Sequence, residues 1–144
     1  MKTLSEEKCK IILQKILSNF GEGKFEEGRY YFDFITTIPK GYTDLKIRVS
    51  ELLDKLEEFE ELLIVFDPNP QNQYYVRSKL RENCAEDLIA GVCVTSSQLK
   101  SILEAADIDM YICDQCGNLL AVATHEDLYD SDERIIWCLV PVEK

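Results

Sequence analysis

Histidine, uninterrupted apolar segments and positive charge are all scarce in this sequence. It has one histidine, His125, which cannot supply the several imidazoles of a histidine-rich metal site. No stretch approaches the ~20 consecutive apolar residues that span a bilayer. The first ten residues turn polar after Leu4 and lack both an apolar core and a small-residue cleavage site, unlike a secretion signal. We therefore expect a cytoplasmic protein that does not enter a membrane.

Negative charge outnumbers positive charge. The 16 Lys and Arg residues face 27 Asp and Glu residues, which gives a net charge of −11 at pH 7. Nucleic acids and anionic membranes are bound through cationic surfaces, so this balance disfavours direct binding to either. It favours a basic protein as the partner.

The motifs of several enzyme classes are missing. Gly21-Glu22-Gly23 lacks the third glycine and the preceding strand of a phosphate-binding loop, and no serine lies in a nucleophile elbow. His125 lies beside Glu126 at the end of a predicted strand, where successive side chains point to opposite faces. We expect no catalytic residues. A small enzyme that uses a cysteine or His125 is the alternative.

The six cysteines are Cys9, Cys84, Cys93, Cys113, Cys116 and Cys138. Without a secretion signal, and with enough apolar residues for a core, we expect reduced thiols. The segment Cys113-Asp114-Gln115-Cys116-Gly117 has the spacing of a zinc knuckle, but a structural zinc site needs four ligands and no second pair exists. We interpret it as a hairpin turn with Cys113 facing inward, and we expect no metal and no other cofactor. A knuckle completed by two distant residues is the alternative.

Apolar residues at helical spacing predict about three helices. The first begins at a capping residue, Ser5 or Thr3, and ends at Gly21. The others are expected over residues 43–61 and after a cap at Ser96 or Ser97.

Strands are predicted where β-branched and aromatic residues alternate or form short apolar runs. Residues 45–49 also alternate, so a short strand followed by a helix capped by Ser50 is the alternative for the second helix. The predicted strands cover residues 29–38, 62–66, 74–77, 92–95, 109–113, 119–124 and 134–140. Together the elements predict one α+β domain over residues 1–144. It has about three helices on one face of a mostly antiparallel sheet of five or six strands.

Two acidic clusters stand out, one over residues 51–61 and one over residues 126–133 in a predicted loop. We predict that the loop contacts a basic partner, because Tyr129 supplies an aromatic anchor and helix packing does not explain the loop. Calcium binding is disfavoured, because the EF-hand spacing and its central glycine are absent. The candidate partner-binding residues are Glu126, Asp127, Tyr129, Asp130, Asp132 and Glu133.

The predicted hairpin over residues 109–126 carries a pattern of its own. It begins Asp109-Met110-Tyr111-Ile112-Cys113-Asp114, and its return strand ends in Thr124-His125-Glu126. This pattern resembles that of small acidic immunity proteins of bacterial polymorphic and contact-dependent toxin systems. The resemblance implies a small cytoplasmic α+β protein without enzymatic activity.

These features together predict a non-catalytic acidic binding protein of the immunity type. It neutralises a basic partner, such as a toxin nuclease, by occluding the site of that partner. A phage or mobile-element inhibitor that mimics the charge of nucleic acid is an alternative, beside the small enzyme described above. We expect a monomer or a homodimer, since an edge strand can pair with a second copy.

Overall fold

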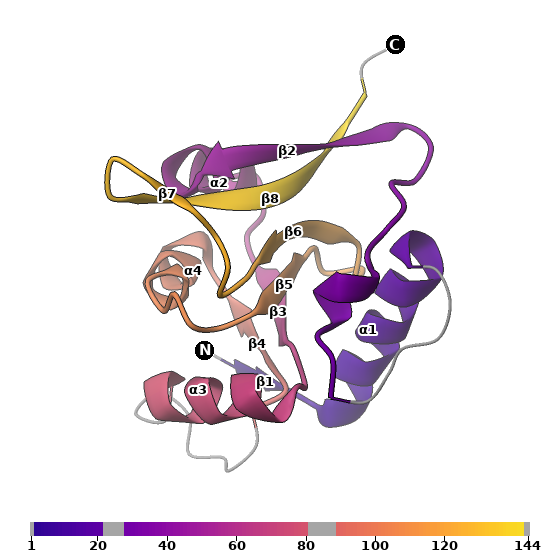
Figure 1. The fold of residues 1–144 in the computed structure, drawn as a ribbon, viewed down its shortest axis with the longest axis vertical. Helices are drawn as coiled ribbons and strands as arrows, with labels where there is room; N and C mark the ends of the chain where they lie inside the picture. The colour runs from indigo at the N-terminus through magenta and orange to yellow at the C-terminus, as the bar shows by residue number, and fades with distance from the viewer. Residues whose placement is uncertain (1, 22–27, 81–88, 143–144) are drawn as a thin grey trace.

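The computed structural model describes residues 2–21, 28–80 and 89–142 (Figure 1). Its helices are α1 (Glu6–Phe20), α2 (Val49–Leu56), α3 (Pro70–Leu80) and α4 (Ser96–Leu103), with a short 3-10 helix η1 (Tyr31–Phe34). Its strands are β1 (Lys2–Leu4), β2 (Tyr42–Arg48), β3 (Leu62–Phe66), β4 (Gly91–Val94), β5 (Met110–Cys113), β6 (Leu119–Ala123), β7 (Tyr129–Asp130) and β8 (Glu133–Pro141). None of the helices within the described ranges is long and apolar enough to cross a membrane.

All strand pairings are antiparallel, in the order β1-β4-β3-β5-β6-β8-β2, with β7 paired to β8 alone. The predicted α+β class and antiparallel sheet are confirmed. The predicted counts were too low, because the described residues form four α-helices and eight strands. At the ends of the sheet lie β1, which was not predicted, and β2, which was predicted only as an alternative; both pair with partners far along the chain.

The helices cover both faces of the sheet, so the prediction that they lie on one face was wrong. Leu63 and Val65 of β3 pack with α1, whereas Leu62, Ile64 and Phe66 pack with α2, α3 and α4. All five residues of β3 are buried, because a strand covered on both faces needs apolar side chains at every position. Figure 1 shows α1 on one side of the sheet and α3 and α4 on the other.

Helix α1 begins where the sequence predicted. The side chain of Ser5 accepts a hydrogen bond from the backbone N–H of Lys8, and Gly21 follows the last turn. The helix lies very close to β4, where a Cβ on Gly91 would meet the Sγ of Cys9 at 2.7 Å and the carbonyl oxygen of Ile64 at 2.6 Å. Glycine is therefore required at position 91 for α1 to pack against the sheet.

Two predicted strands are not strands. Residues 29–38 form η1 and flanking extended chain, because the N–H of Tyr31 donates to the carboxylate of Asp67 instead of to a neighbouring strand. Residues 74–77 belong to α3. Pro70 occupies the first helical position and the side chain of Asn69 accepts from the N–H of Gln71, which starts a helix after the predicted turn.

Residues 43–61 follow the alternative prediction of a strand before a helix. Strand β2 runs to Arg48, which is the N-cap of α2 in place of Ser50. Helix α4 is capped one residue earlier than predicted, by Thr95, which forms a capping box with Gln98. Residues 81–88, which include Cys84, lie outside the described part of the chain.

Candidate functional site

The predicted acidic loop is a β-hairpin. Strands β7 and β8 are joined by Ser131 and Asp132, whose φ angles are 51° and 67°. Two consecutive positive φ angles are typical of a type I′ turn, which matches the twist of the flanking strands. The turn places Asp132 at the exposed tip of the hairpin.

Asp127 lies at the base of this hairpin and is largely buried. Its carboxylate accepts hydrogen bonds from the N–H and the hydroxyl of Thr124, at 3.0 and 3.1 Å, and from Nε of Arg134 at 3.0 Å. The side chain of Arg134 is only 3% exposed, and its remaining nitrogens donate to the carbonyl oxygens of Leu103 and Thr124. Asp127 therefore anchors the hairpin to the body of the protein.

Two more predicted site residues contact the junction of β2 and α2. The carboxylate of Asp130 lies 2.7 Å from the guanidinium of Arg48. The carboxylate of Glu133 accepts from the backbone N–H of Ser50 at 2.8 Å, in the first turn of α2. The hydrogen bonds that the Glu133 carboxylate accepts from Ser50 lower its pKa. Negative charge at a helix N-terminus is stabilising, so Glu133 also helps to fix α2.

The other three predicted residues project toward solvent. Tyr129 is 54% exposed, and its neighbour Leu128 is 70% exposed. Glu126 is also exposed, with its carboxylate 3.9 Å from Nε2 of His125. Within the described part of the chain, Asp132 has no hydrogen-bond or ion-pair partner.

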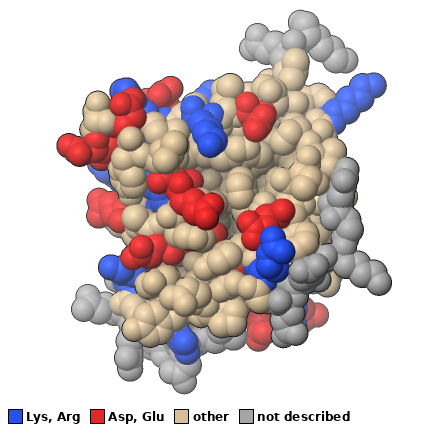
Figure 2. All heavy atoms as spheres, in the orientation of Figure 1, with Lys and Arg blue, Asp and Glu red and all other residues tan. Residues whose placement is uncertain are grey.

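A groove of about 670 Å³ lies between this hairpin, α2 and α4. Four acidic residues line it: Asp54 from α2, Glu104 from the end of α4, Asp132 from the tip and Glu133 from β8. Two basic residues, Lys100 and Arg134, line it as well. Tyr129 and Leu53 add apolar surface. Figure 2 shows acidic side chains gathered on this side of the molecule, at the left of the view. The groove thus joins the two acidic clusters that are far apart in the sequence, and we call it the acidic groove.

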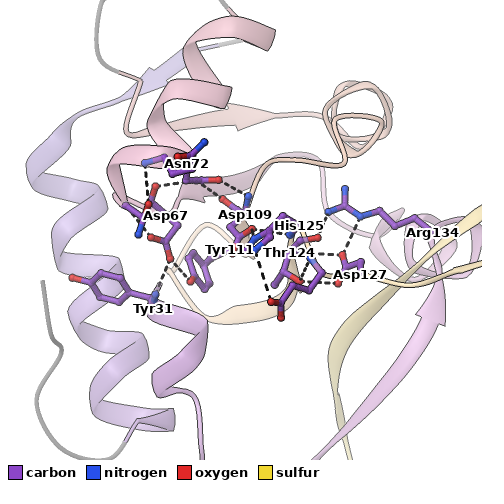
Figure 3. Close-up of polar contacts among 12 residues, drawn as sticks. Tyr31, Asp67, Asn72, Asp109, Tyr111, Thr124, His125, Asp127 and Arg134 are labelled. Carbon is purple, nitrogen blue, oxygen red and sulfur yellow. Dashed lines mark hydrogen bonds and ion pairs between the residues drawn. The ribbon is translucent and has the colours of Figure 1, made fainter. Parts of the chain in front are cut away.

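A buried polar network joins the end of β3, the first turn of α3 and the start of β5 (Figure 3). The carboxylate of Asp67 is fully buried and accepts from the Tyr111 hydroxyl at 2.6 Å and from the N–H of Tyr31 at 2.8 Å. Burial raises the pKa of Asp67, although the hydrogen bonds that it accepts lower it in part. The amide of Asn72 donates to the carbonyl oxygens of Asp67 and Asp109 and accepts from the N–H of Asp109. Asn72 therefore ties the end of β3 to the start of β5.

His125 extends this network to the surface. The carboxylate of Asp109 accepts from the backbone N–H of His125 at 2.7 Å and lies 2.8 Å from its Nδ1. Burial lowers the pKa of His125, but the hydrogen bond to Asp109 and the charge of Asp109 outweigh this effect, so the pKa lies above its ordinary value of 6.5. The ring centroid of Tyr30 lies 5.0 Å from that of His125.

This arrangement orients an imidazole with Nδ1 bound to a carboxylate and Nε2 toward solvent. Such a histidine can exchange protons at Nε2, as acid–base catalysis requires. Covalent catalysis also needs a nucleophile in hydrogen-bond contact with Nε2. Among the described residues, no hydroxyl or thiol makes that contact.

The turn at Cys113 and Cys116 directs the two thiols into different surroundings. Cys113 is buried against α1 and Cys116 is exposed. Burial raises the pKa of the Cys113 thiol to about 12. The carboxylate of Asp114 closes the turn by accepting from the N–H groups of Cys116 and Asn118. No group of three or more potential metal-ligating side chains occurs within the described ranges.

Sequence reasoning missed Asp54, Glu104 and the buried network. One local signal was available, because Asp67 directly follows the apolar run of β3, where a buried polar side chain needs partners. No local signal joins Asp54 to Asp132, since their proximity depends on the pairing of β2 with β8.

No family model, curated protein or solved structure matches this chain.

Proposed function

We propose that this chain is a non-catalytic binding protein of the immunity type, which neutralises a basic partner such as a toxin nuclease by covering the cationic site of that partner. The observation that carries the proposal is the acidic groove. Asp54, Glu104 and Asp132 converge on it from three elements, and none of them has a salt bridge to a described residue. Lysine and arginine side chains of a partner would add positive charge to that of Lys100 and Arg134, which also line the groove.

The apolar rim of the groove supports a protein as the partner rather than a free cation. Tyr129, which is 54% exposed, and Leu53 line the groove beside the carboxylates. Exposed tyrosine gives large contact area at low entropic cost and is common at the centre of protein interfaces. The buried anchor formed by Asp127 and Arg134 holds the hairpin in place, which lowers the entropy lost on binding.

The test starts from the gene next to that of this chain: a large gene that ends in a small basic domain would supply the partner, and a neighbourhood without one would count against the proposal. Stopped-flow association is measured across a salt series for the triple variant Asp54→Asn, Glu104→Gln, Asp132→Asn. The matched control is Glu57→Gln, Glu58→Gln, Glu60→Gln, which removes the same net charge from exposed positions outside the groove.

We expect the groove variant to associate about tenfold more slowly at low salt, with a weaker salt dependence, because it loses the charges that steer encounter. The control should change the rate by a much smaller factor. Equal effects of the two variants would mean that only the overall charge matters. No effect of either would remove the physical basis of the proposal.

A further inference from the structure

Strand β2 is an open edge of the sheet. It is the last strand in the sheet order, and β8 pairs with one edge of it over all seven residues, from Tyr42 to Arg48. No described strand pairs with the other edge. Residues 42–46 are all exposed, and Figure 1 shows no other strand beyond β2. Native proteins usually shorten, bend or cover such an edge, because its unpaired backbone groups can bind another strand.

The geometry of antiparallel pairing restricts how a second copy can bind there. Each residue directs its N–H and its C=O to the same side of the strand, and successive residues alternate. Two identical strands related by a two-fold axis can therefore form hydrogen bonds only in registers where one residue lies directly opposite its own copy. We name the axis after that residue. An axis through Leu45 is the one that pairs all seven residues of β2.

The sequence of β2 is complementary to itself in that register. Asp44 lies opposite Lys46 of the second copy, and Lys46 lies opposite its Asp44. Opposite charges on directly opposed residues stabilise a pair of strands, and like charges destabilise it. An axis through position 44 would oppose two aspartates, and an axis through position 46 would oppose two lysines.

The apolar side of β2 agrees with the same register. Leu45 and Ile47 lie on the face of the sheet that packs with α2, where their register partners on β8 are Cys138 and Ile136. Leu45 is nevertheless 45% exposed, because the sheet ends beside it. In the dimer it would contact Leu45 of the second copy, which continues the apolar layer across the two-fold axis.

We infer that this chain forms a two-fold symmetric homodimer in which the β2 strands of two copies pair antiparallel about Leu45. The two sheets then form one continuous sheet. None of the residues of β2 lines the acidic groove.

The experiment is sedimentation equilibrium of the full chain across a concentration series that reaches the millimolar range. The wild-type protein should change from monomer to dimer within the series. Lys46→Glu places two acidic side chains opposite each other twice in the interface, so it should weaken dimerisation about tenfold or more. The matched control Lys40→Glu makes the same charge change at an exposed position outside β2 and should dimerise like the wild type.

A second variant tests the register. Asp44→Lys opposes lysines at both pairs and should also be monomeric, whereas an equimolar mixture with Lys46→Glu restores opposite charges at every pair and should form a heterodimer. Asp44 also accepts a hydrogen bond from Nε1 of Trp137, so near-ultraviolet circular dichroism confirms that the variant is folded. A wild-type monomer at every concentration would overturn the inference. So would equal behaviour of Lys46→Glu and Lys40→Glu, or a mixture of folded variants that stays monomeric.

Discussion

Two sets of carboxylates in this molecule have opposite environments. Asp67, Asp109 and Asp127 are largely buried, and each accepts at least two hydrogen bonds from other groups of the protein. Asp54, Glu104 and Asp132 are exposed around the acidic groove. A buried carboxylate without donors would cost several kcal/mol, so the first set stabilises the fold only as part of its network. The second set costs little in the monomer and is available to a partner.

The largest expected effect comes from breaking the buried ion pair. Arg134→Met keeps most of the apolar stem. It removes the positive charge and one of the three donors to Asp127, and it removes the guanidinium donors to the carbonyl oxygens of Leu103 and Thr124. We expect a loss of about 3–5 kcal/mol in the free energy of unfolding, measured by urea denaturation. The control Lys10→Met removes an exposed cation outside the groove and should cost about 0.5 kcal/mol or less. Similar losses for both would show that the pair does not anchor the hairpin.

A smaller loss is expected inside the network at Asp67. Tyr111→Phe removes the hydroxyl that donates to this carboxylate at 2.6 Å and leaves the ring in place. The free energy of unfolding should fall by about 1–3 kcal/mol, because a buried charged acceptor loses one donor. Tyr74→Phe, at a position 59% exposed, is the matched control and should be near neutral. A neutral Tyr111→Phe would contradict the difference between the two sets.

The pH dependence tests the link between Asp109 and His125. Because the pKa of His125 is raised in the folded state, its contribution to stability is fully present below the ordinary value of 6.5 and is lost as pH rises through the raised pKa. NMR titration of the single imidazole should give a pKa above 6.5, and Asp109→Asn should lower it. The His125→Gln variant should lack this part of the pH dependence of unfolding. An unchanged titration in Asp109→Asn would rule out the carboxylate as the cause.

The smallest effect on stability is expected in the acidic groove. The variant Asp54→Asn, Glu104→Gln, Asp132→Asn should change the free energy of unfolding by about 0.5 kcal/mol or less at each site. We expect the variant to be slightly more stable than the wild type, because like charges around one groove repel each other. Thermal unfolding at low and high salt measures both the size and the salt dependence. A large loss would place these carboxylates with the structural set.

Local patterns in the sequence correctly predicted the elements whose own spacing of apolar residues shows which side is buried. Helix α1 and strands β3, β4, β5, β6 and β8 are of this kind. Residues 29–38 were misassigned because their aromatic side chains fit a strand equally well, while a distant carboxylate, Asp67, binds the backbone of Tyr31. The strand predicted at 74–77 failed because the turn before it is a helix start at Asn69 and Pro70.

The candidate site was also predicted only in part, because its residues come together through contacts that form only in the folded chain. Tyr129, Asp132 and Glu133 were named from the sequence and do line the groove. Asp127 looked like its acidic neighbours, because the side chain that pairs with it, Arg134, becomes close only when the hairpin turns. Asp54 and Glu104 belong to helices whose positions depend on the completed sheet.

The pairing of β2 with β8 also constrains the order in which this chain can fold. Tyr42 pairs with Pro141 and Arg48 with Ile135. Strand β2 therefore gains its partner only after all the elements from α2 to β7 have been synthesised. Contacts of such long sequence separation slow folding. During synthesis, β2 is exposed along both edges until β8 leaves the ribosome, and unpaired strands are aggregation-prone. Ribosome-bound chains that lack β8 should therefore depend on chaperones more strongly than the finished protein does.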